Sequence, residues 1–408
     1  MKCRHCQSPL TLPLVDLATS PPSNAYLRAD QLNSPERWYP LRVMVCEHCW
    51  LVQTEDFTQA DQLFDADYAY FSSFSDAWLK HAQTYVSTMV ERFGLSAAHR
   101  VVEIASNDGY LLQYVQAAGI PCYGIEPTAS TAAAARAKGV ESIERFFGTA
   151  LADELATAGR QADLIAANNV LAHVPDINDF VAGFARLLTP AGVATFEFPH
   201  LLKLLEHCQF DTIYHEHFSY LSLTAVARIF EANGLQVFDV EEWPTHGGSL
   251  RVFAQRADGP HDVSPTVTAM LARETQAGLT QRDTYHSFQT RAESIKNAFV
   301  GFLLECKSRG ERVAAYGAAA KGNTLINFAG IRADLLAYVV DRNPAKQGKF
   351  LPGSRIPIVS PEHLIADQPA WIVILPWNLR DEVIGQMAEA RQWGARFVTA
   401  IPELTVHA

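Results

Sequence analysis

The sequence lacks features that would place it in several large classes of protein. It has no excess of basic residues, since 33 lysines and arginines stand against 44 aspartates and glutamates, giving a net charge of −11. It has no apolar run long enough to span a membrane, and residues 1–6 do not begin a signal peptide. A nucleic-acid or membrane-surface footprint requires a basic face. We therefore expect a cytoplasmic protein that binds neither nucleic acid nor membrane.

The first nucleotide-binding motif lacks the glycine pattern G-x-G-x-x-G. Residues 101–127 predict a buried strand, a turn, a helix and a second strand ending at Glu126. Ala105 and Asn107 stand where that pattern has glycine, and only Gly109 remains. Because a pyrophosphate must approach the backbone closely, the turn favours a nucleoside without phosphates, such as S-adenosylmethionine, with Glu126 holding its ribose. The alternative is an ordinary α/β core in which Glu126 is a solvated strand end.

The length of 408 residues is enough for two or three domains, each with a core of its own. The content of 48% hydrophobic and 19% charged residues is typical of soluble globular proteins. We expect an α/β protein in three parts. These are a zinc ribbon in residues 1–66, a methyltransferase domain with a class I Rossmann-like doubly wound sheet in 67–261, and a helical connector with a second Rossmann-like domain in 262–408.

Four of the seven cysteines form two C-x-x-C pairs, Cys3 with Cys6 and Cys46 with Cys49. In a chain without an export signal such pairs indicate zinc rather than disulfides. Four thiolates close the tetrahedral shell of zinc and leave no position for water, so the site should be structural. We expect a small lid domain held together by the metal. The alternative, a ribbon that binds nucleic acid, has few cationic residues to support it.

The segment 67–83, which leads into the central domain, is rich in aromatic residues. Ser75 or Asp76 is expected to cap the helix that follows. Tyr68 and Tyr70 either form one wall of a pocket or pack the zinc ribbon onto its neighbour.

The central part of the chain alternates strand and helix signals. An amphipathic helix is predicted over 224–233. The strand signals after the first βαβ unit lie at 163–167, 193–199, 235–240 and 249–254. Their order predicts a doubly wound sheet that ends in an antiparallel hairpin, as in class I methyltransferases.

The same pattern restarts in the last third of the chain. Residues 312–323 predict a strand, a glycine turn and the start of a helix, and strand signals follow at 338–341, 371–375 and 397–401. This order indicates a second Rossmann-like unit. A lone glycine turn is weak support for NAD. Lys321, at the helix start, is placed instead to meet the diphosphate of a large substrate.

The best catalytic candidates lie in segment 214–220, Tyr-His-Glu-His-Phe-Ser-Tyr. His215 and His217 flank Glu216, and in an extended segment this spacing places both imidazoles on one face. The spacing differs from the H-E-x-x-H of zinc peptidases. The functional interpretation is a histidine base held by Glu216 beside a phenol, which suits proton removal next to a ketone. The alternatives are core histidines, a structural network or an adventitious metal pair.

These motifs together resemble those of the bacterial sugar C-methyltransferases that act on dTDP-linked 4-keto-deoxyhexoses. The resemblance runs from one end of the chain to the other and includes both C-x-x-C pairs. The further shared motifs are D-Y-x-Y-x-S-S-x-S, E-I-x-S-N-D-G, G-I-E-P, N-N-V-x-A-H, Y-H-E-H-x-S-Y, H-G-G-S-x-R, Y-G-A-A-A-K-G-N and D-x-N-x-x-K-x-G.

The resemblance implies methyl transfer from S-adenosylmethionine to C3 of a dTDP-linked 4-keto sugar, in a protein with a structural zinc ion. His217 would take the proton from C3, Tyr214 would support the enolate at C4, and Glu216 and His173 would orient this pair. The C-terminal domain would close on the nucleotide. We assign to the donor Tyr70, Glu103, Asn107, Gly109, Glu126 and Asn169, and to the sugar nucleotide Tyr70, His246, Lys321 and Asn323.

Rival functions follow from the same patterns. An O- or N-methyltransferase would use the same donor, and an NAD-dependent sugar oxidoreductase would use the C-terminal domain. A zinc-ribbon binding module without catalysis is disfavoured by the charge balance. The sequence does not distinguish a 3-amino from a 3-hydroxy sugar. It leaves the oligomeric state open, with a monomer favoured.

Overall fold

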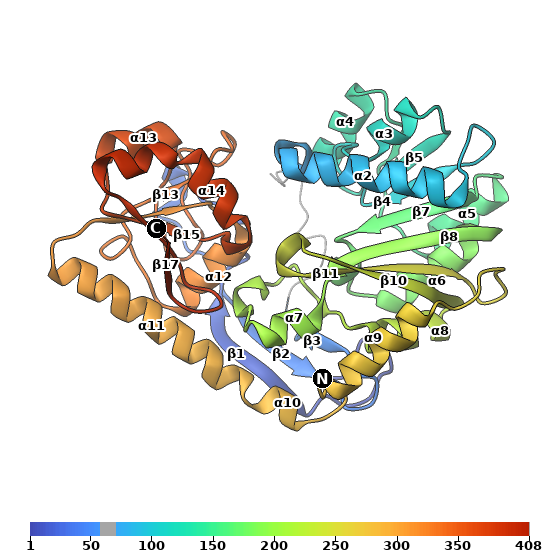
Figure 1. Cartoon of the computed structure of the whole chain (residues 1–408), viewed down its shortest axis with the longest axis horizontal. Coiled ribbons are helices and arrows are strands. Elements are labelled where there is room, and N and C mark those ends of the chain that lie inside the picture. Colours follow the sequence, from blue (N-terminus) through green and yellow to red (C-terminus); the bar gives the residue numbers. More distant parts are fainter. Residues whose placement is uncertain (58–70, 408) are drawn as a thin grey trace.

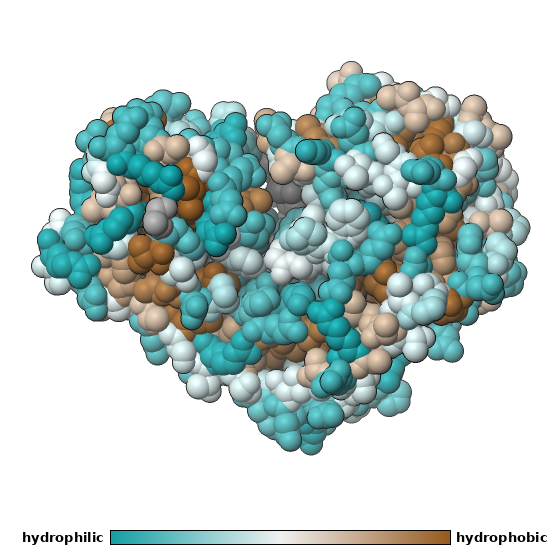
Figure 2. All heavy atoms as spheres, in the orientation of Figure 1, coloured by the Kyte–Doolittle hydropathy of each residue, from teal (hydrophilic) through white to brown (hydrophobic). Residues whose placement is uncertain are grey.

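The computed structural model describes residues 1–57 and 71–407, which form three β-sheets (Figure 1). The predictions made for Tyr68 and Tyr70 therefore lie outside the described residues. The central and C-terminal sheets build two lobes, and the N-terminal sheet lies below and between them. The space-filling view shows a notch in the outline between the two lobes and hydrophilic residues spread over both (Figure 2).

The N-terminal sheet has four strands in the order β1-β2-β3-β9. Its last strand comes from the middle of the chain, because Val52 pairs with Tyr220 and Gln53 with Ser219. The strands are β1 (Leu12–Ser20), β2 (Tyr39–Val45), β3 (Val52–Thr54) and β9 (Ser219–Tyr220). The segment that carries the candidate catalytic residues is thus anchored to the N-terminal sheet.

The central sheet has the order β10-β11-β8-β7-β4-β5-β6, and β11 is antiparallel to both neighbours. The predicted doubly wound sheet with a final antiparallel hairpin is confirmed. The strands are β4 (Val101–Ile104), β5 (Cys122–Ile125), β6 (Ser142–Ile143), β7 (Ala162–Asn168), β8 (Leu188–Pro199), β10 (Leu235–Trp243) and β11 (Ser249–Arg256). The strand order reverses between β4 and β7, and in open α/β sheets ligands bind in a crevice at the carboxyl ends of the strands at such a point.

Helices cover both faces of this sheet, which is why β4 is buried at every residue. Helix α2 begins as predicted, since Ser75 caps it by accepting a hydrogen bond from the Trp78 N–H at 3.2 Å. The α-helices are α2 (Asp76–Phe93), α3 (Leu112–Ala117), α4 (Ala129–Ala137), α5 (Thr149–Thr157), α6 (Ile177–Leu187), α7 (Leu201–Glu206), α8 (Leu223–Ala232) and α9 (Pro265–Gln276).

The C-terminal sheet has the order β14-β13-β12-β15-β16-β17, parallel except for β17. This confirms a second Rossmann-like unit. Its strands are β12 (Val313–Tyr316), β13 (Val339–Val340), β14 (Ile358–Val359), β15 (Trp371–Ile374), β16 (Arg396–Thr399) and β17 (Thr405–His407). Its helices, with those of the connector, are α10 (Asp283–His286), α11 (Phe288–Ser308), α12 (Ala320–Phe328), α13 (Pro361–Asp367) and α14 (Arg380–Gln386).

Short 3-10 helices complete the described chain. They are η1 (Ala29–Gln31), η2 (Ser72–Phe74), η3 (Leu171–His173), η4 (Phe210–Thr212), η5 (Thr245–Gly247), η6 (Trp377–Leu379) and η7 (Ala388–Trp393). Among the helices described, none has both the length and the apolar character needed to cross a membrane.

One hydrophobic core joins the N-terminal sheet to the C-terminal lobe. It contains Leu14 of β1, Leu205 of α7, Phe210 of η4, Phe299 of α11 and Val313 of β12, all nearly or fully buried. Because this core is continuous, the segment between α7 and β9 is held between two sheets. Three of the candidate catalytic residues lie in that segment.

Candidate active site

The turn after β4 has a backbone that few sequences adopt. Ala105, Asn107 and Gly109 have φ angles of 57°, 49° and 76°, and Asn169, just after β7, has a φ of 53°. Left-handed conformations at non-glycine residues are strained and tend to cluster at ligand sites. Here they gather at the carboxyl ends of β4 and β7, the two strands that flank the crevice. A Cβ at Gly109 would also lie 3.1 Å from Val140, so glycine is required there.

Glu126, at the end of β5, is held by two backbone N–H groups of this turn region. One carboxylate oxygen accepts from the Asn107 N–H at 2.8 Å, and the other accepts from the Thr128 N–H at 2.9 Å. Burial raises the pKa of Glu126, and the two N–H groups oppose that rise. Each carboxylate oxygen keeps acceptor capacity, so the group suits the two hydroxyls of a ribose.

Other polar atoms at this edge of the sheet have no partner among the described residues. They are Ser106 Oγ, Asp108 Oδ1 and Asn169 Oδ1, all buried. Buried polar atoms are normally hydrogen-bonded, so this set fits a polar ligand in the crevice. Glu103 lies deeper, within β4, where burial raises its pKa well above the ordinary value. The Asn107 side chain accepts from the Ser72 N–H at 2.9 Å and so holds the segment before α2.

His217 has the geometry of a neutral histidine with one basic nitrogen. Its Nδ1 lies 2.9 Å from the carbonyl oxygen of Thr212, so Nδ1 donates and Nε2 is left unprotonated. Burial, followed by the charges of His173 and Lys321, lowers the pKa of His217 well below its ordinary value. The Tyr214 ring lies over the imidazole with a centroid distance of 4.0 Å, and the His173 ring meets it edge-on at 4.6 Å.

His215 does not share the surroundings of His217, so the prediction that both imidazoles lie on one face is wrong. Residues 214–217 form a turn, closed by the His217 N–H and the Tyr214 carbonyl at 2.9 Å, and not an extended segment. The His215 ring instead contacts the Pro40 carbonyl at 3.2 Å and the Tyr39 ring at 5.9 Å. The spacing rule failed because it assumed strand geometry.

Glu216 has a different partner from the one expected. The side-chain amide of Asn24 donates to its carboxylate, at 2.8 Å from each oxygen, while Thr212 holds the His217 ring. Burial raises the pKa of Glu216 to about 7. Glu216 therefore links the turn at residues 214–217 to the N-terminal segment. The expected support of the imidazole comes from a backbone carbonyl instead.

The C-terminal lobe contributes side chains to the same place. The Thr324 hydroxyl donates to the Ile213 carbonyl at 2.8 Å, which docks α12 against the residue before Tyr214. Lys321, in the first turn of α12, donates to Asn378 Oδ1 at 2.7 Å. Asn323 is 1% exposed, and neither polar atom of its side chain has a partner among the described residues.

His246 reaches the site from the loop between β10 and β11. It has a φ of 56°, its ring meets the Trp78 ring edge-on at 5.3 Å, and burial lowers its pKa to about 4. The next residue, Gly247, packs so closely on Trp377 of the C-terminal lobe that a Cβ would lie 2.4 Å from the indole. The loop therefore bridges the two lobes.

Sequence reasoning missed a buried ionic cluster beside this loop. Glu197, at the end of β8, is fully buried and binds Arg251 at 2.7 Å, His81 at 2.9 Å and the Thr245 hydroxyl at 3.0 Å. The available signal was an acidic residue within the otherwise apolar strand Thr-Phe-Glu-Phe-Pro. The cluster ties α2, β11 and the His246 loop together, with the backbone of Asn169 bonded to Glu197 at 2.7 Å.

The segment after β7 and the turn at residues 214–217, which contain residues predicted for donor binding and for catalysis, are neighbours. The Phe218 N–H bonds to the Ala172 carbonyl at 2.8 Å, and Ala172 lies in η3, three residues after Asn169. The structure thus brings the residues predicted to bind the donor close to those predicted to be catalytic. Tyr70, which was also predicted for this site, lies outside the described residues.

The four cysteines of the C-x-x-C pairs fit a tetrahedral zinc ion. Their sulfur atoms lie within 4.8 Å of one another, and Cys3–Cys49 and Cys6–Cys46 are each 3.5 Å apart. Sulfurs bound to zinc at about 2.3 Å are separated by about 3.8 Å. The two C-x-x-C segments also form the same backbone hydrogen bond. The Gln7 N–H donates to the Cys3 carbonyl oxygen, and the Trp50 N–H donates to the Cys46 carbonyl oxygen.

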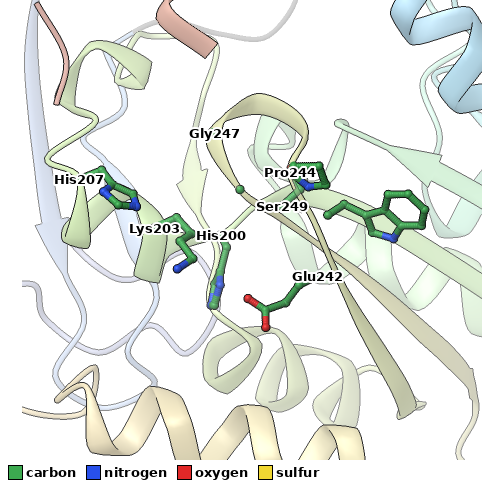
Figure 3. A pocket seen from close by; sticks show the side chains of 9 residues that line it. His200, Lys203, His207, Glu242, Pro244, Gly247 and Ser249 are labelled. Carbon is green, nitrogen blue, oxygen red and sulfur yellow. The ribbon is translucent and has the colours of Figure 1, made fainter. Parts of the chain in front are cut away.

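A surface cavity of about 430 Å³ lies behind the loop that carries His246 (Figure 3). It contains none of the predicted site residues. Its lining includes His200, Lys203, His207 and Glu242, together with the backbone around Gly247. The cavity therefore borders the candidate site only through the backbone of this loop.

Comparison with known proteins covers nearly the whole chain. Three family models match it, described as "Putative zinc binding domain" (residues 3–64), "Methyltransferase domain" (78–240) and "C-methyltransferase C-terminal domain" (244–402). The chain is 37% identical over 402 residues to C-methyltransferase NovU of Streptomyces niveus, covering 98% of this chain and 96% of NovU.

Two solved structures that the chain is similar to each match less than half of it. A magnesium protoporphyrin IX methyltransferase of Synechocystis PCC 6803 is 17% identical, with a TM-score of 0.34 over 44% of this chain and 79% of its own. The glycopeptide N-methyltransferase MtfA is 14% identical, with a TM-score of 0.35 over 43% of this chain and 96% of its own. The assignment of the chain to a family depends instead on the nearly full-length match to NovU and on the three family models. The chain belongs to the C-methyltransferase family that includes NovU; it uses S-adenosylmethionine and has a zinc-binding domain with four clustered cysteines.

Proposed function

We propose that this enzyme methylates C3 of a dTDP-linked 4-keto-deoxyhexose through an enolate at C4, in deoxysugar biosynthesis. The observation that carries the proposal is the state of His217, a neutral imidazole whose Nδ1–H is bound to Thr212 and whose Nε2 is left to accept a proton. A base with a phenol stacked against it suits proton removal beside a carbonyl more than attack by a hydroxyl or amine.

His217 removes the C3 proton with Nε2, and the electron pair of the C3–H bond moves toward the C4 oxygen. Tyr214 supports the enolate that results. S-adenosylmethionine supplies the methyl group, and C3 forms its new bond as the bond from that methyl to sulfur breaks. Holding both reactants in contact can contribute up to about 7–11 kcal/mol, and the C-terminal lobe helps to exclude water from the enolate.

The remaining residues bind or position. His173 packs edge-on against His217 and restricts its ring, while Glu216 fastens the turn through Asn24. The donor is held by Glu103, Asn107, Gly109, Glu126 and Asn169. The sugar nucleotide contacts His246, Lys321 and Asn323. We place the reaction in the cytoplasm, a reducing compartment in which cysteine thiolates remain available to zinc.

The test combines a His217→Asn variant with a substrate deuterated at C3. Asparagine keeps hydrogen bonding but cannot take the proton, so turnover should fall by about 10²–10⁴ while calorimetry shows donor and sugar binding unchanged. The matched control is His215→Asn, which should retain most of the turnover because that ring faces Pro40. The deuterium should be absent from C3 of the product.

Three results would contradict the proposal. Near-normal turnover in His217→Asn would remove this residue as the base. A product whose methyl group is bonded to oxygen or nitrogen, as read from NMR correlations between the methyl protons and the sugar ring, would indicate an O- or N-methyltransferase. A change in nicotinamide absorbance during turnover would favour the oxidoreductase alternative.

A further inference from the structure

Lys321 belongs to the C-terminal lobe, on a helix that is docked against the turn at residues 214–217. It lies in the first turn of α12, and Thr324 of the same helix binds the Ile213 carbonyl at 2.8 Å. Ile213 immediately precedes Tyr214 in the chain. The docking of α12 therefore sets the distance between a lysine of one lobe and the proposed base of the other.

The ammonium group of Lys321 is only partly satisfied by the protein. It donates to Asn378 Oδ1 at 2.7 Å and lies 4.8 Å from the centre of the Trp377 ring. An ammonium carries three N–H donors, and within residues 1–57 and 71–407 the structure gives this one a single hydrogen bond. Two donors remain for a ligand.

Asp211 and Trp377 hold this cation in place. Asp211 is fully buried and accepts a hydrogen bond from the Trp377 indole N–H at 2.8 Å. Its charge favours the charged form of Lys321, which burial alone would disfavour. The indole ring thus contacts the lysine through its face and the carboxylate through its edge.

The position of Lys321 favours one part of the substrate over another. Thr324 of the same helix binds the carbonyl that precedes Tyr214, and Trp377, whose ring Lys321 contacts, packs against Gly247 next to His246. These contacts place the ammonium on the side of the site where His217 and His246 lie. The pKa directions agree, since the charge of Lys321 lowers the pKa of both histidines. When C3 of the sugar is placed at His217, the C4 oxygen is on the adjacent carbon. The diphosphate is attached at C1, on the far side of C2. A cation close to the base therefore lies closer to the C4 oxygen.

The charge balance supports the same choice. A diphosphate brings two or more full charges, whereas the charge of Lys321 is already partly balanced by the carboxylate of Asp211. An enolate develops a single charge, and only during the reaction. A cation that stabilises this charge acts on the transition state more than on the bound substrate, which is what lowers the barrier.

From these contacts we infer that Lys321 is a catalytic residue that stabilises the negative charge on the C4 oxygen, held in place by Asp211 and Trp377. This inference rests on the proposed function. The C3 proton passes to Nε2 of His217, the C3–H pair forms the C3–C4 double bond, and the carbonyl π pair moves onto the oxygen facing Lys321. When C3 takes the methyl group the carbonyl re-forms, and Lys321 keeps all its protons throughout.

The experiment separates enolisation from methyl transfer and from diphosphate binding. The enzyme is loaded with S-adenosylhomocysteine, which has no methyl group to give, and with a dTDP-4-keto-deoxyhexose deuterated at C3. Loss of deuterium to water then reports enolate formation. Lys321→Met should slow this loss by about 10²–10³-fold, as for removal of one oxyanion donor. Lys321→Arg should restore part of the rate, and the affinity for dTDP alone should change less than twofold.

A second variant guards against misfolding. Lys321→Met leaves Asp211 buried without its cation, so the double variant Lys321→Met/Asp211→Asn removes both charges and should be as slow as the single variant while retaining zinc and dTDP binding.

A normal rate of deuterium loss in Lys321→Met or in the double variant would overturn the inference. So would weakened dTDP binding with normal deuterium loss, which would return Lys321 to the diphosphate. No deuterium loss in the wild-type enzyme would overturn the proposed function, and the inference with it.

Discussion

Replacement of Glu197 by glutamine should break the buried ion pair at the end of β8. Both Glu197 and Arg251 are almost completely buried, and the carboxylate accepts from Arg251 at 2.7 Å and from His81 at 2.9 Å. Glutamine has nearly the same shape but no charge. The substitution therefore leaves the buried guanidinium with only the more distant carboxylate of Glu241, at 3.5 Å. Removing one partner of a buried ion pair typically costs about 3–5 kcal/mol.

The pKa of Glu197 gives a second measure of the same interaction. Burial alone would raise this pKa, but the hydrogen bond from His81 and the charge of Arg251 outweigh burial and lower it from 4.5 to about 2. One pKa unit corresponds to about 1.4 kcal/mol, so the carboxylate stabilises the folded state by about 3 kcal/mol. Because the folded pKa is the lower one, this contribution is complete above pH 4.5 and is lost as the pH falls toward 2.

The assay is urea unfolding followed by tryptophan fluorescence, since Trp243 and Trp78 lie beside the cluster. Glu197→Gln should lower the unfolding free energy at pH 7 by about 3–5 kcal/mol, and the gap to wild type should narrow between pH 5 and pH 3. The control is Glu242→Gln, whose pair with Arg273 is about half exposed and is worth about 0–1 kcal/mol. A loss below about 1 kcal/mol, or a gap that does not change with pH, would refute the reasoning.

Two further predictions concern the metal and the donor. Cys46→Ser should lose the one zinc ion per chain and expose the N-terminal sheet to proteolysis, whereas Cys122→Ser should keep the zinc; a full zinc content in Cys46→Ser, measured by metal analysis, would exclude the four-cysteine site. Glu126→Ala should weaken S-adenosylmethionine binding by about 1.5–3 kcal/mol in calorimetry, because a charged hydrogen bond to the ribose is lost. Tight NAD binding with unchanged donor affinity in that variant would contradict the assignment.

The fold was predictable where local pattern and burial agree. Parallel strands covered on both faces appear in the sequence as short apolar runs, so β4 and β12 were found within a residue or two. Strand β9 was not found, because two residues carry no periodicity and their partner, β3, lies far away in the chain. The same limit applies to β6, which also has two residues.

The site was predictable where a residue type and its spacing carry the chemistry. The C-x-x-C pairs and the acidic end of β5 need no knowledge of tertiary contacts. The orientation of His215 and His217 does need it, because a turn closed by Tyr214 sends the two rings to different partners. Glu197 was visible as a carboxylate in an apolar strand, but its partner Arg251 comes from a strand more than fifty residues later.

The N-terminal sheet, next to the zinc site, supports the turn at residues 214–217. Gln53 of β3 donates to Cys3 Sγ at 3.2 Å and pairs through its backbone with Ser219 of β9, two residues after His217. Its neighbour Thr54 donates to the His217 carbonyl at 3.1 Å. Zinc therefore fixes the loop of Cys3, that loop fixes β3, and β3 fixes the backbone of the proposed base. A site with no open coordination position can thus control catalysis through a strand that it holds in register, without any contact between the metal and the substrate.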